Sequence, residues 1–473
     1  MHKSCYTIAN PTLMGQAMKL KIPDEIVKIY KKIHDSNFEI YLVGGCVRNI
    51  LLEKDVKDWD MTTNATPQEL LKLFKNGFYD NDFGTVGIPI KDKKVAEVTT
   101  FRTEHGYKDR RRPEKVQWGK TIEEDLSRRD FTINAIALGI EAQPQGSAHK
   151  IIDPFNGRED IKSKIIKAVG DPKLRFKEDA LRLMRAIRLA TELSFTIEEN
   201  TWTEIVSDAS LINEISKERI QIELLRILSS DYPYEGLMLL RNSGLLEHIV
   251  AELLEGEGVS QARPGRHHTT DVFTHNVMSL KFCPSKDPIV RFATLIHDVG
   301  KPKVASKDEN GVVIFHNHEL AGAKIAQALC ERLKFSKKDK EKVVNLIRWH
   351  MFTVDEKITD AAVRRFIRRV GVENVKDMMD LRIGDRLGGG TQTAESWRLK
   401  LFKKRVEEQL KPAPFSINDL AIDGNDVMKI LNIKPGPKIG KILQKLFEEV
   451  DEDLSRNTKE YLIDRISKLS KTN

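Results

Sequence analysis

The chain of 473 residues is 40% hydrophobic and 31% charged, and its formal net charge is +8. This composition predicts a soluble globular protein of roughly two to four domains. It excludes a membrane-spanning protein, because no stretch approaches the ~18 consecutive apolar residues that a bilayer requires. The basic charge favours a polyanionic partner only weakly, since so small an excess often serves solubility alone.

The four cysteines are scattered without a CxxC pair. This spacing fits a reducing compartment and argues against a disulfide framework or a cysteine zinc site. The N-terminal segment also lacks the apolar run of a signal peptide. We therefore expect a cytoplasmic protein without membrane contact.

Two kinds of periodicity follow each other along the chain. Strand-like runs at 40–45, 86–90 and 95–101 alternate with helical segments in the first third. From about residue 174 amphipathic helical patterns dominate, as in 178–193 and 217–230. The sequence thus predicts a multidomain protein with an N-terminal α/β head, a mixed sheet plus helices, and an all-helical remainder.

A glycine pair and two aspartates follow the first predicted strand. Gly44 and Gly45 lead into a helix that carries Arg48, and this turn suits a phosphate group. Asp58 and Asp60 are two residues apart, so in an extended segment both carboxylates point to one side and can hold divalent ions. Such ions serve phosphoryl-group transfer by activating the attacking hydroxyl and neutralising the leaving group. Alone, an Asp-x-Asp pair is more often a solvated surface feature.

Five segments within residues 40–195 together resemble the tRNA nucleotidyltransferases, or CCA-adding enzymes, and the bacterial poly(A) polymerases. In chain order they are GGCVRN with DWDMTTNATP, FRTEHGYKDRRRP, EEDLSRRDFTINAIAL, IIDPFNGREDI and FKEDALRLMRAIRLA. The resemblance implies Mg²⁺-dependent nucleotidyl transfer from CTP and ATP to tRNA, with Asp58 and Asp60 as catalytic metal ligands. One departure is Asn49, where the family usually has aspartate.

The resemblance and the Gly- and Pro-rich breaks give approximate domain boundaries. We expect a nucleotidyltransferase head (22–165), a helical neck (166–255), an HD domain (266–390) and a helical tail that binds tRNA (391–473). In the tail, a Pro-Gly-Pro-Lys turn opens into a helix with Lys438 and Lys441, which suits contact with a phosphate backbone. A helical hairpin with soluble lysines is an equally good interpretation.

The segment around Asp179 and Arg182 is a candidate for nucleotide selection. If it is one helix, the two side chains share a face. A carboxylate accepts from the exocyclic amino group of C or A, while arginine donates to the neighbouring ring nitrogen. The resemblance implies this protein-templated reading of CTP and ATP, although a solvated Arg-rich helix face is the simpler interpretation of the segment alone. The further nucleotide-binding candidates of the segment are Arg185 and Arg188.

Three further features lie between the aspartates and the neck. The resemblance implies that Arg129 binds the incoming nucleotide and that Asp130 lies close to its sugar. Glu97 is a possible third metal carboxylate, although a solvent-facing glutamate is equally compatible with its strand. The basic segment 102–113 predicts a mobile loop, which the resemblance associates with addition of the terminal A.

Histidines and aspartates in the second half predict a separate metal site. The motif His297-Asp298 follows an apolar helix, and with His275 and Asp385 it resembles the ligand set of HD phosphohydrolases. The metal's identity stays open at this point. A second ion site, or merely the border of the cleft, is a further possibility for His316, His318 and His350.

The predicted function is therefore addition of CCA to the 3′ end of tRNA without a nucleic-acid template. An A-adding enzyme and a poly(A) polymerase are the nearest alternatives. An HD-type phosphohydrolase with a retained head belongs to a second class, but it predicts damaged head carboxylates, which the sequence does not have. A non-catalytic RNA-binding protein gives no reason for two sets of metal-ligand residues.

Overall fold

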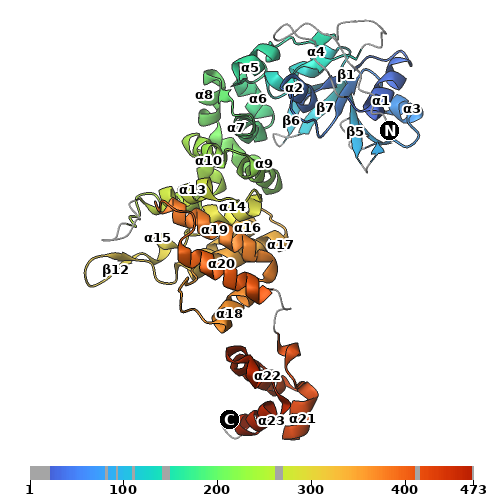
Figure 1. The fold of residues 1–473 in the computed structure, drawn as a ribbon. Coiled ribbons are helices and arrows are strands. Elements are labelled where there is room, and N and C mark those ends of the chain that lie inside the picture. Colours follow the sequence, from blue (N-terminus) through green and yellow to red (C-terminus); the bar gives the residue numbers. More distant parts are fainter. Residues whose placement is uncertain are drawn as a thin grey trace. The chain divides into compact units, whose positions relative to one another are not determined.

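The computed structural model describes residues 22–79, 84–91, 94–108, 112–140, 150–261, 270–410 and 416–470 (Figure 1). The chain divides into two compact units, residues 1–251 and 252–473, each of which is considered by itself. In these described ranges, no helix combines the length and the apolar character needed to cross a membrane.

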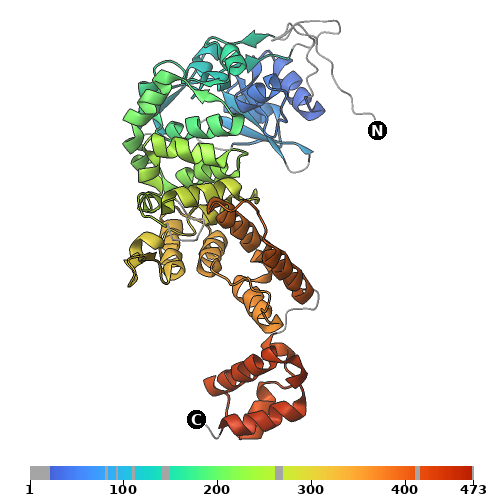
Figure 2. The same ribbon diagram turned by 60° about the vertical axis from the view of Figure 1, so that its left-hand side comes forward.

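The first unit contains a seven-stranded sheet with the order β3-β4-β5-β2-β1-β8-β9. Figure 2 shows helices of the same unit packed beside this sheet. Strands β2 and β5 are parallel and the other neighbours are antiparallel, so the predicted mixed sheet is confirmed. The strands are β1 (Ile40–Val43), β2 (Asp60–Thr63), β3 (Phe78–Tyr79), β4 (Thr85–Pro89), β5 (Val95–Thr100), β8 (Ala137–Leu138) and β9 (Ile151–Ile152).

Helices join and cover these strands. They are α1 (Asp24–His34), α2 (Gly45–Leu51), α3 (Pro67–Leu73), α4 (Ile122–Ser127) and α5 (Gly157–Ser163). Helices α3 and α4 each begin with a reciprocal capping box, Thr66 with Glu69 and Thr121 with Glu124. The cap fixes the start of α4, which determines where the following Arg128-Arg129-Asp130 segment emerges.

The basic segment 102–113 is not the loop that its composition predicts. Its described residues form β6 (Arg102–Lys108) and the start of β7 (Arg112–Trp118), which pair antiparallel from Arg102 opposite Trp118 to Lys108 opposite Arg112. Residues 109–111 lie outside the described residues. Pairing satisfies the backbone polar groups irrespective of side-chain charge, and a short connection between such strands is typical of a hairpin.

The neck is helical, but its candidate selecting segment is not one helix. Helix α6 (Pro172–Glu178) ends before Asp179, whose backbone is extended (φ −145°, ψ 101°), and α7 (Leu181–Leu193) follows. The Asp179 carboxylate accepts a hydrogen bond from the backbone N–H of Leu181 at 3.1 Å. It thus satisfies a free donor at the start of α7, as capping aspartates do. The remaining neck helices are α8 (Glu199–Ser207), α9 (Lys217–Ser229), α10 (Pro233–Asn242), α11 (Leu245–Ile249) and α12 (Ala251–Leu254), the last of which spans the boundary between the units.

The second unit begins with a bundle in which α13 and α19 approach closely. A Cβ atom at Gly388 would lie 2.3 Å from Ser279 Oγ, and one at Gly384 would lie 2.6 Å from Ser279 O. These glycines permit the contact that brings Asp385 beside α13. The helices of this part are α13 (Val272–Phe282), α14 (Pro288–Leu295), α15 (Lys301–Val304), α16 (His318–Arg332), α17 (Lys337–Trp349), α18 (Asp360–Val370), α19 (Val375–Gly388) and α20 (Trp397–Leu410).

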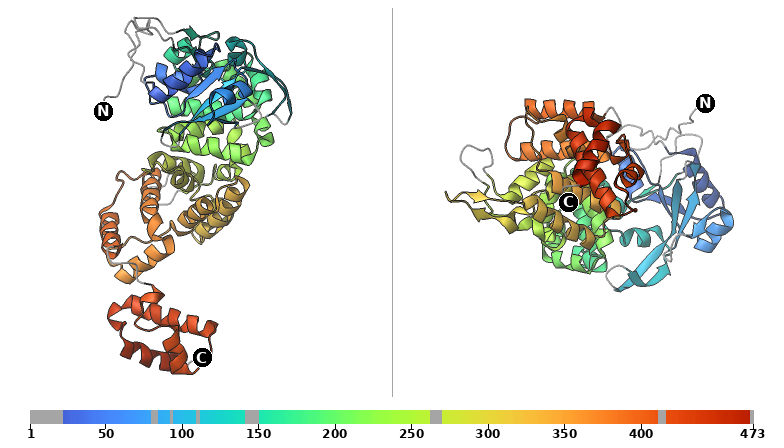
Figure 3. Two further views of the ribbon diagram at one scale, coloured as in Figure 1. Left: turned by 90° about the vertical axis from the view of Figure 1, so that its right-hand side faces the viewer. Right: turned by 90° about the horizontal axis from the view of Figure 1, so that it is seen from below.

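The last helices, α21 (Gly424–Leu431), α22 (Pro437–Glu452) and α23 (Lys459–Ser470), enclose a separate hydrophobic core (Figure 3). Helix α20 precedes this core and packs against α18, where Phe366 and Phe402 lie 5.1 Å apart between ring centroids. Asp451 of α22 is 1% exposed and accepts hydrogen bonds from Arg364 and Arg368 of α18.

Candidate functional site

The turn after β1 brings a carboxylate and a guanidinium together. Gly44 has a φ of +73°, a backbone conformation that residues other than glycine rarely adopt. A Cβ atom there would lie 3.2 Å from Arg129 Nη1 and 3.5 Å from Asp60 Oδ2. The glycine therefore leaves room for Asp60 and Arg129 to meet at the turn.

The two aspartates of the Asp-x-Asp pair differ in environment. Asp60 is half-buried at the start of β2, Asp58 is exposed before it, and Trp59 between them is only 7% exposed. Burial raises the pKa of Asp60, Arg129 opposes this shift, and Asp58 adds to it. On the neighbouring parallel strand Glu97 stands directly beside Asp60 in the register, so both residues belong to one face.

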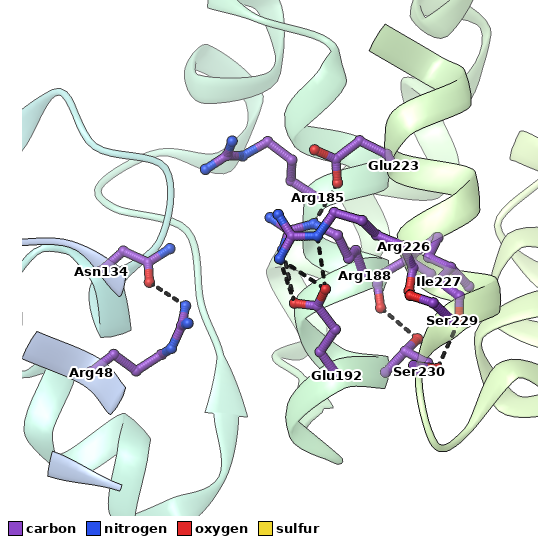
Figure 4. A network of polar contacts seen from close by, with 12 residues as sticks. Arg48, Asn134, Arg185, Arg188, Glu192, Glu223, Arg226, Ile227, Ser229 and Ser230 are labelled. Atoms are coloured by element: carbon purple, nitrogen blue, oxygen red, sulfur yellow. Dashed lines mark hydrogen bonds and ion pairs between the residues drawn. The ribbon is translucent and has the colours of Figure 1, made fainter. Parts of the chain in front are cut away.

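Arg48 is held by two amide oxygens, and Figure 4 shows its bond to Asn134. It donates to Asn134 Oδ1 at 2.7 Å and to Asn49 Oδ1 at 2.9 and 3.2 Å. Burial, followed by the charge of Arg188, lowers the pKa of Arg48. Both partners are neutral, so Arg48 is oriented without being neutralised. Asn134 was not a predicted site residue, and only the fold brings it to Arg48.

A fully buried carboxylate, Asp125, organises the arginines that precede the neck. Arg128 donates to Asp125 Oδ1 at 2.6 Å, and Arg129 donates to Asp125 Oδ2 at 3.0 Å. Burial raises the pKa of Asp125, but the two arginines outweigh it, and the pKa lies below its ordinary value. Asp125 was missed from the sequence. Its spacing of three and four residues from the arginines on a helical turn was the available signal.

Asp130 is held by Arg185 of α7. Arg185 Nε and Nη2 donate to Asp130 Oδ2 at 2.9 and 2.5 Å, and Asn134 Nδ2 donates to Asp130 Oδ1 at 3.1 Å. Burial raises the pKa of Asp130, but Arg185 and Asn134 outweigh it, and the pKa is lowered. Asp130, Asn134 and Arg48 therefore form a continuous chain of hydrogen bonds.

The candidate selecting residues Asp179 and Arg182 have other partners. Arg219 of α9 donates to both oxygens of Asp179, at 3.0 and 2.7 Å. Arg182 donates to Glu178 at 2.6 Å and to the backbone carbonyl of Arg128 at 3.0 Å. Arg182 therefore links the neck to the arginines that Asp125 holds. Arg219 was missed because nothing in the local sequence connects it to Asp179, forty residues earlier.

Arg188 lies in a buried ion-pair network (Figure 4). Its Nε donates to Glu223 at 2.5 Å and its Nη1 donates to Glu192 at 2.8 Å, and Arg226 also pairs with Glu192. The Arg188 side chain is only 5% exposed. The Arg188–Glu223 pair joins α7 to α9.

In the second unit, four histidines surround the carboxylate of Asp298. The Nε2 atoms of His275 and His297 both lie 3.3 Å from Asp298 Oδ2. The Nε2 atoms of His318 and His350 lie 3.3 and 3.6 Å from Asp298 Oδ1. The two oxygens of one carboxylate therefore face two separate pairs of imidazoles.

Asp385 completes the first of these groups. Its Oδ1 lies 3.3 Å from His275 Nε2 and 3.7 Å from His297 Nε2. The atoms of His275, His297 and Asp385 are close enough to hold one ion, and so are those of His297, Asp298 and His350. His316 is exposed and lies outside both groups.

The imidazoles are oriented as metal ligands usually are. The Nδ1 atoms of His297, His318 and His350 lie 2.7 to 2.8 Å from backbone carbonyls, to which they donate, so in the neutral imidazole each Nε2 carries a lone pair that faces the cluster. Gly300 contributes to the framework, because a Cβ there would lie 2.1 Å from His318 O. The donor set of imidazole nitrogens and carboxylate oxygens fits a transition metal ion.

The charge of this cluster also fits a cation. Burial lowers the pKa of His297, but Asp298 and Asp385 outweigh it and raise the pKa to about 10. Burial lowers the pKa of His350. The two buried carboxylates therefore demand positive charge nearby, and Lys301 Nζ supplies some of it at 2.5 Å from Asp298 Oδ2.

The mixed sheet, the Gly-Gly turn and the paired carboxylates define a nucleotidyltransferase head. Comparison with known families agrees: residues 40–167 match the poly A polymerase head domain and residues 194–255 match the probable RNA and SrmB-binding site of polymerase A. Residues 305–466 match the putative tRNA nucleotidyltransferase domain 2. Enzymes of this class generally use a divalent metal ion.

Comparison with individual proteins identifies the family within this class. The chain is 32% identical to the A-adding tRNA nucleotidyltransferase of Deinococcus radiodurans over 86% of this chain and 90% of that protein. It is 41% identical to the CCA-adding enzyme of Lactobacillus helveticus, in an alignment that spans 48% of this chain and little more than half (56%) of that enzyme. The crystal structure of the Bacillus stearothermophilus CCA-adding enzyme in complex with CTP covers 95% of this chain, with 98% of its own length, a TM-score of 0.70 and 25% identity. The chain belongs to the tRNA nucleotidyltransferase family, which includes the CCA-adding enzymes.

Proposed function

We propose that this chain adds C and A residues from CTP and ATP to the 3′ end of tRNA, using one site in the head. The observation that carries the proposal is the meeting of Asp60 and Arg129 at the Gly44 turn. A carboxylate for a metal ion and a guanidinium for a phosphate then lie side by side, as nucleotidyl transfer requires. Relatives named as CCA-adding and A-adding enzymes support the same activity.

In this proposal Asp58 and Asp60 hold Mg²⁺, for which carboxylate oxygens are suitable ligands. The bound ion would lower the pKa of the attacking 3′ hydroxyl and offset charge on the leaving pyrophosphate. Arg48 and Arg129 bind the triphosphate, and Asp130 positions Arg185 and Asn134 beside it. Glu97 is a third carboxylate on the same face of the sheet as Asp60.

Asp179 and Arg182 read the base. The Asp179 carboxylate accepts two hydrogen bonds from Arg219 and one from Leu181, and its two oxygens offer about four lone pairs, so one remains for the amino group of C or A. Arg182 has five N–H donors and can keep its bond to Glu178 while donating to a ring nitrogen. Arg219 is therefore a positioning residue that fixes the direction of the Asp179 carboxylate.

The decisive experiment supplies purified protein with Mg²⁺, each labelled nucleotide, and tRNA that ends at the discriminator base, at C or at CC. Full CCA addition requires CTP incorporation into the two shorter tRNAs and ATP incorporation into the longest. Incorporation of ATP alone would establish an A-adding enzyme. Repeated ATP incorporation into unrelated RNA would instead establish a poly(A) polymerase.

A second candidate function belongs to the Asp298 cluster, namely metal-dependent hydrolysis of a phosphoester. The two imidazole pairs around the Asp298 carboxylate favour it, because these residues would hold metal ions that activate water and neutralise charge on a phosphoester. In the reaction, water oxygen bonds to phosphorus, the ester P–O bond breaks, and the alcohol leaves with a proton.

The hydrolytic function is tested by release of phosphate from p-nitrophenyl phosphate with Mn²⁺, Co²⁺, Ni²⁺ or Mg²⁺. Asp60→Ala should retain this release, and His297→Ala should abolish it while nucleotide addition persists. Absence of release with every metal in the wild-type protein would refute the second function and leave the first intact.

A further inference from the structure

A cavity of about 370 Å³ lies beside the Asp298 cluster, between α19, the start of α20 and the segment that follows His350. Its lining includes Phe352, Arg382, Arg386, Trp397 and Arg398. Three of these residues are arginines, and none of the residues that line the cavity is acidic. A concave site with this charge and an aromatic wall suits a small anionic ligand with a flat apolar group.

Two walls of the cavity are continuous with segments that carry cluster ligands. Arg382 Nη1 donates to Asp385 Oδ2 at 2.9 Å, so one arginine of the cavity touches a ligand of the first histidine group. On the other wall, the backbone N–H of Phe352 donates to the carbonyl of His350 at 3.1 Å. A ligand in the cavity is therefore next to the cluster.

The arginines still have donors to offer. Arg386 Nε is buried and, within the described part of the chain, no hydrogen-bond partner reaches it. The guanidinium of Arg382 lies 5.5 Å from the ring of Phe352, and that of Arg398 lies 5.3 Å from the ring of Trp397.

Trp397 supplies a platform for a base. Its side chain is large and apolar, yet the residue is 58% exposed at the start of α20. An exposed tryptophan beside arginines is the combination with which proteins stack a nucleobase and hold its phosphate.

We propose that this cavity is a subsite for a nucleoside phosphate, in which Trp397 stacks on the base and Arg386 and Arg398 hold the phosphate. Arg382 lines the cavity and donates to Asp385, so it connects the subsite to the cluster. The inference rests on the proposed hydrolytic function for the fate of the ligand, but binding itself is independent of it. The same chemistry is offered by a free nucleotide and by the last nucleotide of an RNA.

The test measures binding of adenosine 3′-monophosphate to the full-length protein by calorimetry in EDTA, which prevents hydrolysis. Arg386→Ala should weaken binding at least about tenfold, because a charge-assisted donor is lost. Trp397→Ala should weaken it about fivefold or more through lost stacking, yet leave binding of ribose 5-phosphate unchanged. Lys400→Ala removes an exposed charge one turn along α20 and should change nothing.

Three outcomes overturn the subsite. The first is absence of nucleotide binding to the wild type, and the second is equal affinity in Arg386→Ala, Trp397→Ala and Lys400→Ala. The third is loss of binding in Asp60→Ala, which would assign the nucleotide to the head. Thermal unfolding, together with the conservative variants Arg386→Lys and Trp397→Phe, separates loss of the site from loss of folding.

A four-residue RNA with a 3′ phosphate serves as the second probe. Tighter binding than the mononucleotide, with the same dependence on Arg386, identifies an RNA end as the ligand, and weaker binding identifies a free nucleotide. Binding that depends on Arg386 and Trp397 without phosphate release under Mn²⁺ would retain the subsite and refute the hydrolytic function. Phosphate release under Mn²⁺, with nucleotide binding unchanged in Arg386→Ala and Trp397→Ala, would retain the hydrolytic function and refute the subsite.

Discussion

The head site and the Asp298 cluster are both candidate metal sites, but they differ in their donor atoms and in their exposure. In the head, exposed Asp58 and half-buried Asp60 offer oxygen atoms beside Arg129. In the cluster, His297 and Asp298 are 1% and 2% exposed and nitrogen donors predominate. An open oxygen site suits ions that arrive and leave with each nucleotide, whereas a buried imidazole site suits a resident ion.

The largest expected effect comes from Asp60→Asn. The substitution preserves the size of the side chain and removes the charge that would hold Mg²⁺. Nucleotide addition should fall on the order of 10³-fold or more. Steady-state incorporation of ATP into tRNA ending in CC measures the loss, while filter binding of the same tRNA should remain within about twofold. Turnover close to wild type would remove Asp60 from the metal site.

Asp298→Asn should have the opposite effect to Asp60→Asn, because it should impair the cluster and spare the head site. One carboxylate faces both imidazole pairs, so the variant should lose both ions, and phosphoester hydrolysis should fall at least about 100-fold. Nucleotide addition should be unchanged. Elemental analysis of the dialysed protein counts the ions.

His350→Ala sharpens this comparison. It removes a member of the group of His297, Asp298 and His350 but leaves the Asp298 carboxylate beside His275, His297 and Asp385, so the ion count should fall by one. His316→Ala is the matched control, since His316 is exposed and lies outside both groups. An ion count that is the same for His350→Ala and His316→Ala would limit the cluster to one ion.

The features that could be predicted from the sequence are those that neighbouring residues determine. The strand, the Gly44 turn and Asp60 all lie within twenty-one residues of chain, and their spacing implies their geometry. The partners of the candidate residues could not be predicted in this way. Arg219 reaches Asp179 across forty residues, and the burial of Asp125 depends on packing of the whole head.

Two local errors have a similar cause. The helical pattern that starts near residue 174 continues through Asp179, but the Asp179 carboxylate caps Leu181 and the Asp179 backbone leaves the helix. Aspartate prefers capping positions, and this preference indicated a helix start near Asp179. The regular spacing of apolar residues favoured one continuous helix instead. In 102–113, charge and composition predicted a loop, although strand pairing depends on backbone hydrogen bonds.

Asp125→Asn should reduce stability by an intermediate amount and change its dependence on pH. The folded pKa of Asp125 is depressed, so its contribution is fully present above the unfolded value of about 3.9 and is lost as pH falls through the lower folded pKa. At pH 7 the variant should be less stable by about 3 kcal/mol, because Arg128 and Arg129 lose a buried partner. Urea unfolding should show the two proteins converging below pH 4. A constant difference down to pH 2 would contradict the ion pair.

The smallest expected effect concerns Asn49, at a position where the family usually has aspartate. Asn49 accepts from Arg48 without neutralising it. A carboxylate in Asn49→Asp would offset the charge of Arg48, and water would screen part of that effect because residue 49 is partly exposed. KM for ATP and CTP should rise about two- to fivefold with little change in kcat, since an exposed pair is worth at most about 1 kcal/mol. Asn49→Ser, which adds no charge, should change KM less than Asn49→Asp. A fall in KM would mean that Arg48 orients Asn134 and does not attract the triphosphate.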